Sequence, residues 1–413
     1  MISLCWTICK GDRSYDKALE IKPDLHAWNI RGIALGKLGR SEEAIVCYDK
    51  ALEIKPDKHE AWNSRGIALD KLGRLEEAIA SYDKALELKP DDCEAWYNRG
   101  IALGNLGRLE EAISSYDKAL ELKPDKHEAW CYRGIALGNL GRLEEEIYSY
   151  DKALNIKSNL HNIWYNRGFA LGNLGRLEEA IASYDKALDL KPNDCETWNN
   201  KGILLYQSGK LEAAIKSYDT ALELKKDFHK AWYNRGFTLY KLGRLEAAID
   251  SYDKALEFNH NDDEALFFRG VAQVDLGLFE EAIASYNKSL ELKLNNHEAW
   301  YNRGIALGKL ERLEEANASL DQAIKMTTFP NSLEVEIYGC EAWKNRALAL
   351  YILGKLEAVI SSYDNALAIQ PNDYESWYNR GIVLGNLGRL EEAIASIDRA
   401  IQNFLTVNPR PKS

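Results

Sequence analysis

The chain has 413 residues, of which 46% are hydrophobic and 28% are charged, so it carries enough apolar material to fold. Its 64 acidic residues outnumber its 53 basic residues, which gives a formal net charge of −11. This balance argues against a sequence-independent nucleic-acid binder, which needs a basic surface to neutralise phosphates, and against docking on anionic lipid. We therefore expect no nucleic-acid partner and no membrane partner.

Residues 1–24 contain only the end of a segment that recurs throughout the chain, SYDKALEIKPD, and we interpret them as a partial repeat. The apolar start, MISLCWTIC, lacks the basic region and the cleavage site of a signal peptide. No apolar run approaches the ~18 residues of a membrane span. The cysteines are odd in number and form no CxxC pair, which favours free thiols in a reducing compartment. These features predict a cytoplasmic protein.

From residue 25 onward, tryptophans mark an internal repeat. Seven of them are spaced 34 residues apart, namely Trp28, Trp62, Trp96, Trp130, Trp164, Trp198 and Trp232. Leu266 keeps this step, Trp300 resumes it, Trp343 comes 43 residues later, and Trp377 follows after another 34. Position 1 is the first residue of each repeat, so that the tryptophan stands at position 4. The eleven repeats begin at Leu25, His59, Cys93, His127, His161, Cys195, His229, Asp263, His297, Cys340 and Tyr374.

The repeats define the expected organisation of the chain. Nine of them fill residues 25–330 and two fill residues 340–407. Nine extra residues, 331–339, form an insertion between these two sets, and residues 408–413 form a proline-containing tail. Apolar residues in the insertion continue a helical spacing, so we expect it to lengthen the first helix of the next repeat.

Each repeat has the pattern of two helices, as in the one that begins at Cys93. Apolar residues recur at helical spacing on both sides of Gly107. Gly107 follows the last apolar residue of the first helix, where helices commonly end in a residue of left-handed conformation, usually glycine. In one repeat Glu311 takes the place of this glycine. An aspartate three residues before a glutamate, as in Asp57 and Glu60, predicts an N-cap for the first helix.

Positions 8 and 20 of most repeats carry residues with little or no side chain, such as Gly100 and Ala112. Glycine in a helix costs ~1 kcal/mol relative to alanine, so its recurrence in ten of eleven repeats indicates a gain from close helix packing. A single hairpin cannot bury both of its faces, and neighbouring hairpins must therefore stack. The sequence predicts an all-α fold, an α-solenoid of stacked helix-turn-helix hairpins.

Eight positions carry a recurring set of residues. In the repeat from Cys93, positions 4, 8, 11, 15, 20, 24, 27 and 32 hold Trp96, Gly100, Leu103, Gly107, Ala112, Tyr116, Ala119 and Pro124. This set, with its period of 34, resembles the tetratricopeptide repeat (TPR) family over about nine-tenths of the chain. The resemblance implies a right-handed superhelix and a scaffold that binds other proteins.

The residues that could bind a metal or take part in catalysis do not form a recognisable site in the sequence. Five of the seven histidines begin repeats, namely His59, His127, His161, His229 and His297. Metal ligands must converge to ~2 Å from an ion, which residues on different repeats cannot do. No GxxxxGK[ST], GxSxG or HExxH motif occurs. We therefore predict that the protein is not an enzyme and has no catalytic residues, no metal site and no cofactor.

Two positions carry opposite charges along the whole array. Position 7 is basic in every repeat and position 25 is nearly always aspartate, as in Arg99 and Asp83. The preferred interpretation is a structural ladder of ion pairs between helices, in which each partly exposed pair contributes ~0–1 kcal/mol and helps to fix register. The alternative is an arginine-lined track for a ligand.

In TPR proteins, positions 2, 5, 6, 9, 12 and 13 of the first helix usually line a concave face. Position 6 is asparagine in seven repeats, at Asn98, Asn166, Asn200, Asn234, Asn302, Asn345 and Asn379. Position 5 is tyrosine at Tyr97, Tyr165, Tyr233, Tyr301 and Tyr378. An amide both donates and accepts hydrogen bonds, so the asparagines could hold a peptide backbone without reading its side chains.

This asparagine pattern resembles the asparagine ladder in the superhelical arm of O-GlcNAc transferases. The asparagines and tyrosines are therefore candidate peptide-binding residues. In the alternative interpretation, the amides solvate the surface or bond the neighbouring helix.

We predict a non-catalytic scaffold or adaptor for protein–protein interaction, which binds extended peptide segments along a concave groove. One alternative is the substrate-targeting arm of a larger, O-GlcNAc-transferase-like enzyme whose catalytic domain is absent from this chain. Another is a self-assembling structural solenoid that forms homo-oligomers.

Glu146 departs from the pattern, because it stands at position 20, where nine repeats have alanine. A buried, unpaired charge is costly, so we expect its carboxylate to reach Arg133, another partner or solvent.

Overall fold

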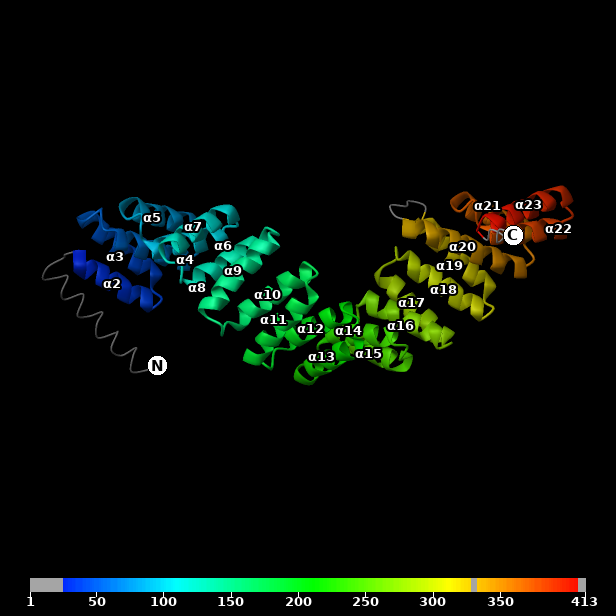
Figure 1. Cartoon of the computed structure of the whole chain (residues 1–413), viewed down its shortest axis with the longest axis horizontal. Helices are drawn as coiled ribbons and strands as arrows, with labels where there is room; N and C mark the ends of the chain where they lie inside the picture. Colours follow the sequence, from blue (N-terminus) through cyan, green and yellow to red (C-terminus); the bar gives the residue numbers. More distant parts are fainter. Residues whose placement is uncertain (1–24, 328–332, 408–413) are drawn as a thin grey trace, which may run out of the picture. The chain divides into compact units, whose positions relative to one another are not determined.

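In a computed structural model, the backbone of residues 25–327 and 333–407 is described, and within these ranges every regular element is an α-helix (Figure 1). The predicted partial repeat at 1–24 and the tail at 408–413 lie outside the described residues, as does the start of the predicted insertion at 331–339. The chain divides into two compact parts, Met1–Thr197 and Trp198–Ser413, and each is treated by itself.

The first part contains five consecutive hairpins of two helices each. Each first helix begins at the residue that opens a repeat, as the sequence predicts, and most helices have 13 or 14 residues. In chain order the helices are α2 (Leu25–Lys37), α3 (Ser41–Ile54), α4 (His59–Lys71), α5 (Leu75–Leu88), α6 (Cys93–Asn105), α7 (Leu109–Leu122), α8 (His127–Asn139), α9 (Leu143–Ile156), α10 (His161–Asn173) and α11 (Leu177–Leu190).

The second part continues the same pattern, and the division between the parts falls within its first helix, α12. Its helices are α12 (Cys195–Gln207), α13 (Leu211–Leu224), α14 (His229–Lys241), α15 (Leu245–Phe258), α16 (Asp263–Asp275), α17 (Phe279–Leu292), α18 (His297–Lys309), α19 (Leu313–Thr327), α20 (Leu333–Ile352), α21 (Leu356–Ile369), α22 (Tyr374–Asn386) and α23 (Leu390–Val407).

The turn inside each hairpin depends on the residue at position 15. Gly107 has φ +78°, and its equivalents in the other glycine-containing repeats lie between +72° and +79°, a region that only glycine enters without steric cost. Arg108 N then donates to Leu103 O at 2.9 Å and closes the end of α6. Glu311 takes the same left-handed conformation, with φ +58°. The expected glycine turn is confirmed.

The glycine at position 8 allows the two helices of a hairpin to approach each other. A Cβ built on Gly100 would lie 2.5 Å from Cε1 of Tyr116, which occupies position 24 on the facing helix. The tyrosine ring is buried and fills the space that the glycine leaves open. This contact recurs at the other glycine–tyrosine pairs and explains why both residues recur.

Successive hairpins are joined through the tryptophan at position 4. The indole Nε1 of Trp96 donates to Pro90 O at 2.9 Å, which ties a first helix to the last turn of the preceding repeat. The same bond forms at Trp62, Trp130, Trp164, Trp232, Trp300 and Trp377. In the first part, one cluster of buried apolar residues extends from Leu35 on α2 to Leu137 on α8. The stacked-hairpin prediction is therefore confirmed.

Two local expectations have different outcomes. The predicted N-cap at Asp57 is wrong, because the residue next to α4 is Lys58, which makes no side-chain capping bond. In α6 the adjacent residue is Asp92, whose carboxylate accepts from the backbone N–H groups of Glu94 and Ala95. A lengthened helix after the insertion is confirmed, since α20 has 20 residues.

The described helices also bear on membrane insertion. None of them combines the length and the apolar composition that crossing a bilayer requires.

Candidate functional site

The charged ladder is built into the packing between hairpins. Arg99 Nε donates to Asp83 Oδ1 at 2.6 Å, and its Nη1 donates to Ser115 Oγ at 2.7 Å. Its guanidinium also lies 5.8 Å from the centre of the Trp96 ring. Equivalent ion pairs join Arg65–Asp49, Arg133–Asp117, Arg167–Asp151, Arg235–Asp219, Arg269–Asp253, Arg346–Asp321 and Arg380–Asp364. The structural interpretation of the ladder is confirmed, and these donors are engaged within the chain.

The candidate binding surface lies on the first helices. We define the first-helix face as the side chains at positions 5, 6, 9, 12 and 13, which include the predicted asparagines and tyrosines. The helical period brings these positions to one side of each first helix. The arrangement of the asparagines on this face therefore decides what the face can bind.

The asparagines at position 6 are partly used by contacts between repeats. Asn98 Nδ2 donates to Asn63 Oδ1 at 3.3 Å, and Asn234 Nδ2 donates to Asn199 Oδ1 at 3.0 Å. In both pairs the acceptor stands at position 5 of the preceding repeat. The alternative in which the amides bond the neighbouring helix therefore holds at these two sites.

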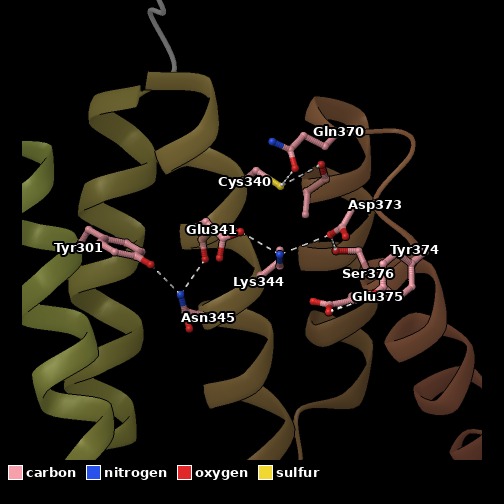
Figure 2. A network of polar contacts seen from close by, with 11 residues as sticks. Tyr301, Cys340, Glu341, Lys344, Asn345, Gln370, Asp373, Tyr374, Glu375 and Ser376 are labelled. Carbon is pink, nitrogen blue, oxygen red and sulfur yellow. Dashed lines mark hydrogen bonds and ion pairs between the residues drawn. The ribbon is translucent and has the colours of Figure 1, made fainter. Parts of the chain in front are cut away.

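Figure 2 shows the same contact with a tyrosine as acceptor. Asn345 Nδ2 donates to Tyr301 Oη at 3.1 Å and to Glu341 O at 3.0 Å (Figure 2). Beside it, Lys344 Nζ lies 2.8 Å from Glu341 Oε1 and 3.5 Å from Asp373 Oδ2. Burial opposes the charge of Lys344, but its hydrogen bond with Glu341 and the charge of Asp373 outweigh burial and raise its pKa. Asn345 and Lys344 are thus held in place from within the chain.

The remaining candidate asparagines differ in their surroundings. Asn166 hydrogen-bonds Tyr150, and Asn379 hydrogen-bonds Tyr363. Asn200 accepts a 3.3 Å bond from Asn199 Nδ2. For Asn302, no side-chain hydrogen bond is found within the described part of the chain. The seven amides are therefore not equivalent.

The tyrosines at position 5 also vary. Tyr97 lies against Tyr116 and Tyr132, with Lys126 Nζ 4.4 Å from the centre of its ring. Burial raises the pKa of Tyr97. Tyr378 is exposed. Tyr165 and Tyr233 each pack against the tyrosine at position 24 of their own repeat, Tyr184 and Tyr252.

Cavities open on the first-helix face at equivalent places in the two compact parts. One of about 350 Å³ lies between α8, α9 and α10, and Asn166 is in its wall. Another of about 200 Å³ lies between α18, α19 and α20, and Asn345 is in its wall. A third, of about 460 Å³, contains His161 and Lys191 in its wall and shares Tyr165 and Asn166 with the first. Three of the predicted residues therefore line cavities.

Glu146, which the sequence marks as an exception, lies in the wall of a cavity that the sequence did not predict. Glu146 is 6% exposed and stands in the wall of the 350 Å³ cavity. Its carboxylate reaches the Tyr150 hydroxyl rather than Arg133, and burial raises its pKa. A Cβ on Gly138 would lie 2.7 Å from this carboxylate, so the absence of a side chain there makes room for it. The substitution of alanine by Glu146 was the available signal.

A metal site needs several ligand side chains gathered at one place. In residues 25–327 and 333–407, no three His, Cys, Asp or Glu side chains lie close enough together to hold a metal ion. The described cysteines, Cys47, Cys93, Cys131, Cys195 and Cys340, are free thiols.

Comparison with known families gives matches along most of the array. A family profile described as TPR repeat matches residues 68–107, 202–243 and 272–311. Profiles described as Tetratricopeptide repeat match residues 26–58, 93–126, 161–194, 229–262, 47–80, 115–148, 183–216, 362–395 and 297–328. Together these matches cover more than half of the chain. Among curated proteins, no match was found.

Solved structures share the helical-hairpin fold. The C-terminal part of a TPR repeat-containing protein from Cytophaga hutchinsonii is 19% identical, covers 59% of this chain and 96% of its own, and gives a TM-score of 0.53. YrrB, a TPR protein with an unusual peptide-binding site, is 24% identical over 45% of this chain and 95% of its own, with a TM-score of 0.42. The Cut9–Hcn1 hetero-tetramer of APC/C supplies a match at 15% identity over 99% of this chain and 92% of that chain, with a TM-score of 0.41.

Proposed function

Because the chain belongs to the tetratricopeptide repeat family, we propose that it is a non-catalytic scaffold that binds extended segments of partner proteins along its first-helix face. Proteins of this family act in protein–protein interactions. The finer assignment, to extended peptide segments and to particular side chains, rests on the geometry around Asn166.

The observation that carries this proposal is the position of Tyr165 and Asn166. Both residues border two cavities, of about 350 Å³ and about 460 Å³. A peptide that crosses α10 between these cavities passes the Asn166 amide, and its side chains can enter the cavity on either side. Sites for small groups usually have this combination of hollow volume and a few placed polar groups.

The amides have bonding capacity left for a ligand. An asparagine side chain has two N–H donors and a carbonyl acceptor, and Asn98 uses one donor toward Asn63. Each hydrogen bond to a peptide backbone contributes a net ~0.5–1.5 kcal/mol, while ordering of a flexible ligand costs several kcal/mol in total. We expect micromolar affinity, broad sequence tolerance and modest salt dependence.

The test is selection from a phage-displayed library of random dodecapeptides on the whole chain, followed by titration of the enriched peptides. Replacement of Asn200, Asn234 and Asn302 by alanine should lower the affinity for peptides that bind the second compact part at least tenfold. Helical content should stay unchanged, because alanine has the higher helix propensity. Circular dichroism checks this point.

The matched control replaces two exposed asparagines on second helices, Asn155 and Asn365, by alanine. This variant should bind the selected peptides as the wild-type protein does. Equal binding by the triple variant would place the site elsewhere, and the absence of any enriched peptide would contradict the proposal.

A second candidate, self-assembly, is favoured by one surface. Ile394 and Ile401 on α23 are 62% and 52% exposed, whereas Ile113 and Leu120 at the same positions of α7 are each 6% exposed. In α7 these positions pack under the next hairpin, and within the described residues α23 has no such cover. An exposed apolar helix face of this kind is typical of an interaction surface.

Light scattering across a range of concentrations tests this candidate. Self-assembly predicts a mass above that of one chain which rises with concentration, and its loss when Ile394 and Ile401 are replaced by lysine. Both side chains are more than half exposed, so the folded array should tolerate the change. A constant single-chain mass for the wild-type protein would exclude the candidate.

A further inference from the structure

The cavity between α8, α9 and α10 contains a buried carboxylate that its counterpart in the second compact part lacks. Glu146 stands at position 20 in the first cavity, and Ala316 stands at the same position in the second. Positions 6, 9, 12, 13, 17, 20 and 24 border both cavities, and at position 24 the first has Tyr150 where the second has Leu320. The first cavity therefore has a chemical feature that the general repeat does not supply.

The Glu146 carboxylate is only partly satisfied by the protein. A carboxylate can accept about four hydrogen bonds, and Tyr150 provides one. The ladder cation of the same repeat, Arg133, directs Nε to Asp117 and Nη1 to Ser149 instead. No lysine or arginine lines this cavity. A buried carboxylate with unused acceptor capacity attracts any cation that can enter the cavity.

The walls of the cavity suit a long cationic side chain. Ile135 and Leu143 offer apolar surface for methylene groups, which lysine and arginine side chains bury while the charged end reaches a polar partner. Tyr165 and Phe169 border the same space, and Phe169 is 53% exposed. Aromatic faces attract ammonium and guanidinium groups. The volume of about 350 Å³ lies within the range of ~300–1,000 Å³ that is usual for ligand pockets.

We infer that this cavity is a specificity pocket for a lysine or arginine side chain of the bound segment, with Glu146 as its counter-ion. The inference rests on the proposed function and adds a sequence preference to it. Asn166 lies at the cavity wall, so an amide that holds the backbone stands next to the pocket that takes the side chain. Pairing compensates the buried carboxylate, which is costly when it is alone.

The experiment compares two nonapeptides on the whole chain, acetyl-GAGAKGAGA-amide and its analogue with norleucine in place of lysine. Norleucine keeps the methylene chain and removes the charge. Ligand-observed NMR titration should show at least tenfold tighter binding of the lysine peptide. The Glu146→Gln variant keeps the size of the side chain and should bring the two peptides to within about twofold of each other.

The control variant is Glu144→Gln, which removes a charge from the exposed side of the same helix turn. It should retain the preference for lysine. Equal binding of the two peptides by the wild-type chain, or a preference that persists in Glu146→Gln, would overturn the inference while leaving the proposed function intact.

A second probe separates failure of the pocket from failure of the peptide surface. If neither nonapeptide binds, the proposed function fails for these segments, and butylammonium is titrated alone. Butylammonium binding that Glu146→Gln abolishes would support the cation pocket. Absent binding, or equal binding by the variant, would overturn it.

Discussion

Arg99 on α6 joins Asp83 on the second helix of the preceding repeat, with 2.6 Å between Nε and Oδ1. The same guanidinium donates to Ser115 of its own hairpin, so one side chain fixes both the stacking of hairpins and the packing inside one of them. A partly exposed pair contributes little by charge alone, but the planar guanidinium sets the direction of two bonds at once.

The first prediction concerns this arginine. Arg99→Met keeps the apolar stem and removes both hydrogen bonds, and we expect a loss of about 1–2 kcal/mol of local stability. Hydrogen exchange in α6 and α7 measures it, because repeat arrays can open locally. Arg108→Met, which removes an exposed pair with Glu111, should change stability by less than about 0.5 kcal/mol. Equal effects of the two variants would contradict the structural role of the ladder.

The second prediction compares two glycines of α6. Gly100→Ala places a Cβ 2.5 Å from the Tyr116 ring, so overpacking of about 1–3 kcal/mol should outweigh the gain in helix propensity. At Gly104 the nearest atom to a Cβ is Tyr116 Oη at 3.7 Å, so Gly104→Ala should be neutral or stabilising by up to about 1 kcal/mol. Thermal unfolding should show opposite shifts for the two variants.

The third prediction is that Glu146→Ala stabilises the array by about 1 kcal/mol. The variant removes a buried carboxylate and restores the alanine of nine other repeats. If the cation pocket is correct, the same variant loses the preference for a lysine peptide, so stability and specificity change in opposite directions. A clear fall in the thermal midpoint would show that the carboxylate is well paired in the free protein.

The fourth prediction is the pH dependence of Glu146. Burial raises its folded-state pKa above the ordinary value of 4.5, so the folded state binds more protons than the unfolded state. The contribution of Glu146 to stability is therefore fully present below 4.5 and is lost as pH rises through the folded pKa. Relative to Glu146→Gln, the wild-type protein should lose unfolding free energy on going from pH 4.5 to pH 8. A difference that does not vary with pH would contradict the burial of the carboxylate.

The fifth prediction concerns the turn of α18 and α19. Glu311 has φ +58°, a conformation that costs a residue with a side chain about 1–2 kcal/mol. Glu311→Gly should therefore raise stability by about 1 kcal/mol, and Gly107→Glu should lower it by a similar amount. Urea unfolding of both variants tests this pair. A stabilising Gly107→Glu would show that the turn does not depend on the residue at position 15.

The sequence determined the hairpins because their signals are local and recur with one period. One repeat and its neighbour were enough to predict where most first helices begin, the left-handed turn at Gly107 and the pairing of Arg99 with Asp83. The TPR family follows from the same positions. Each prediction was possible because every repeat meets nearly the same surroundings, so a residue type that recurs must make a contact that recurs.

Tertiary structure alone decided the contacts that depend on side-chain direction. The indole of Trp96 donates to Pro90 O, and the amide of Asn98 turns to Asn63 of the previous repeat. Neither bond has a signature in the spacing. Glu146 was visible as an exception in the sequence, but only the packing of three helices places it in a cavity beside Asn166. The reason is physical: periodicity fixes which face a residue occupies, whereas hydrogen-bond partners and cavity volume depend on the shapes of all the neighbours that meet there.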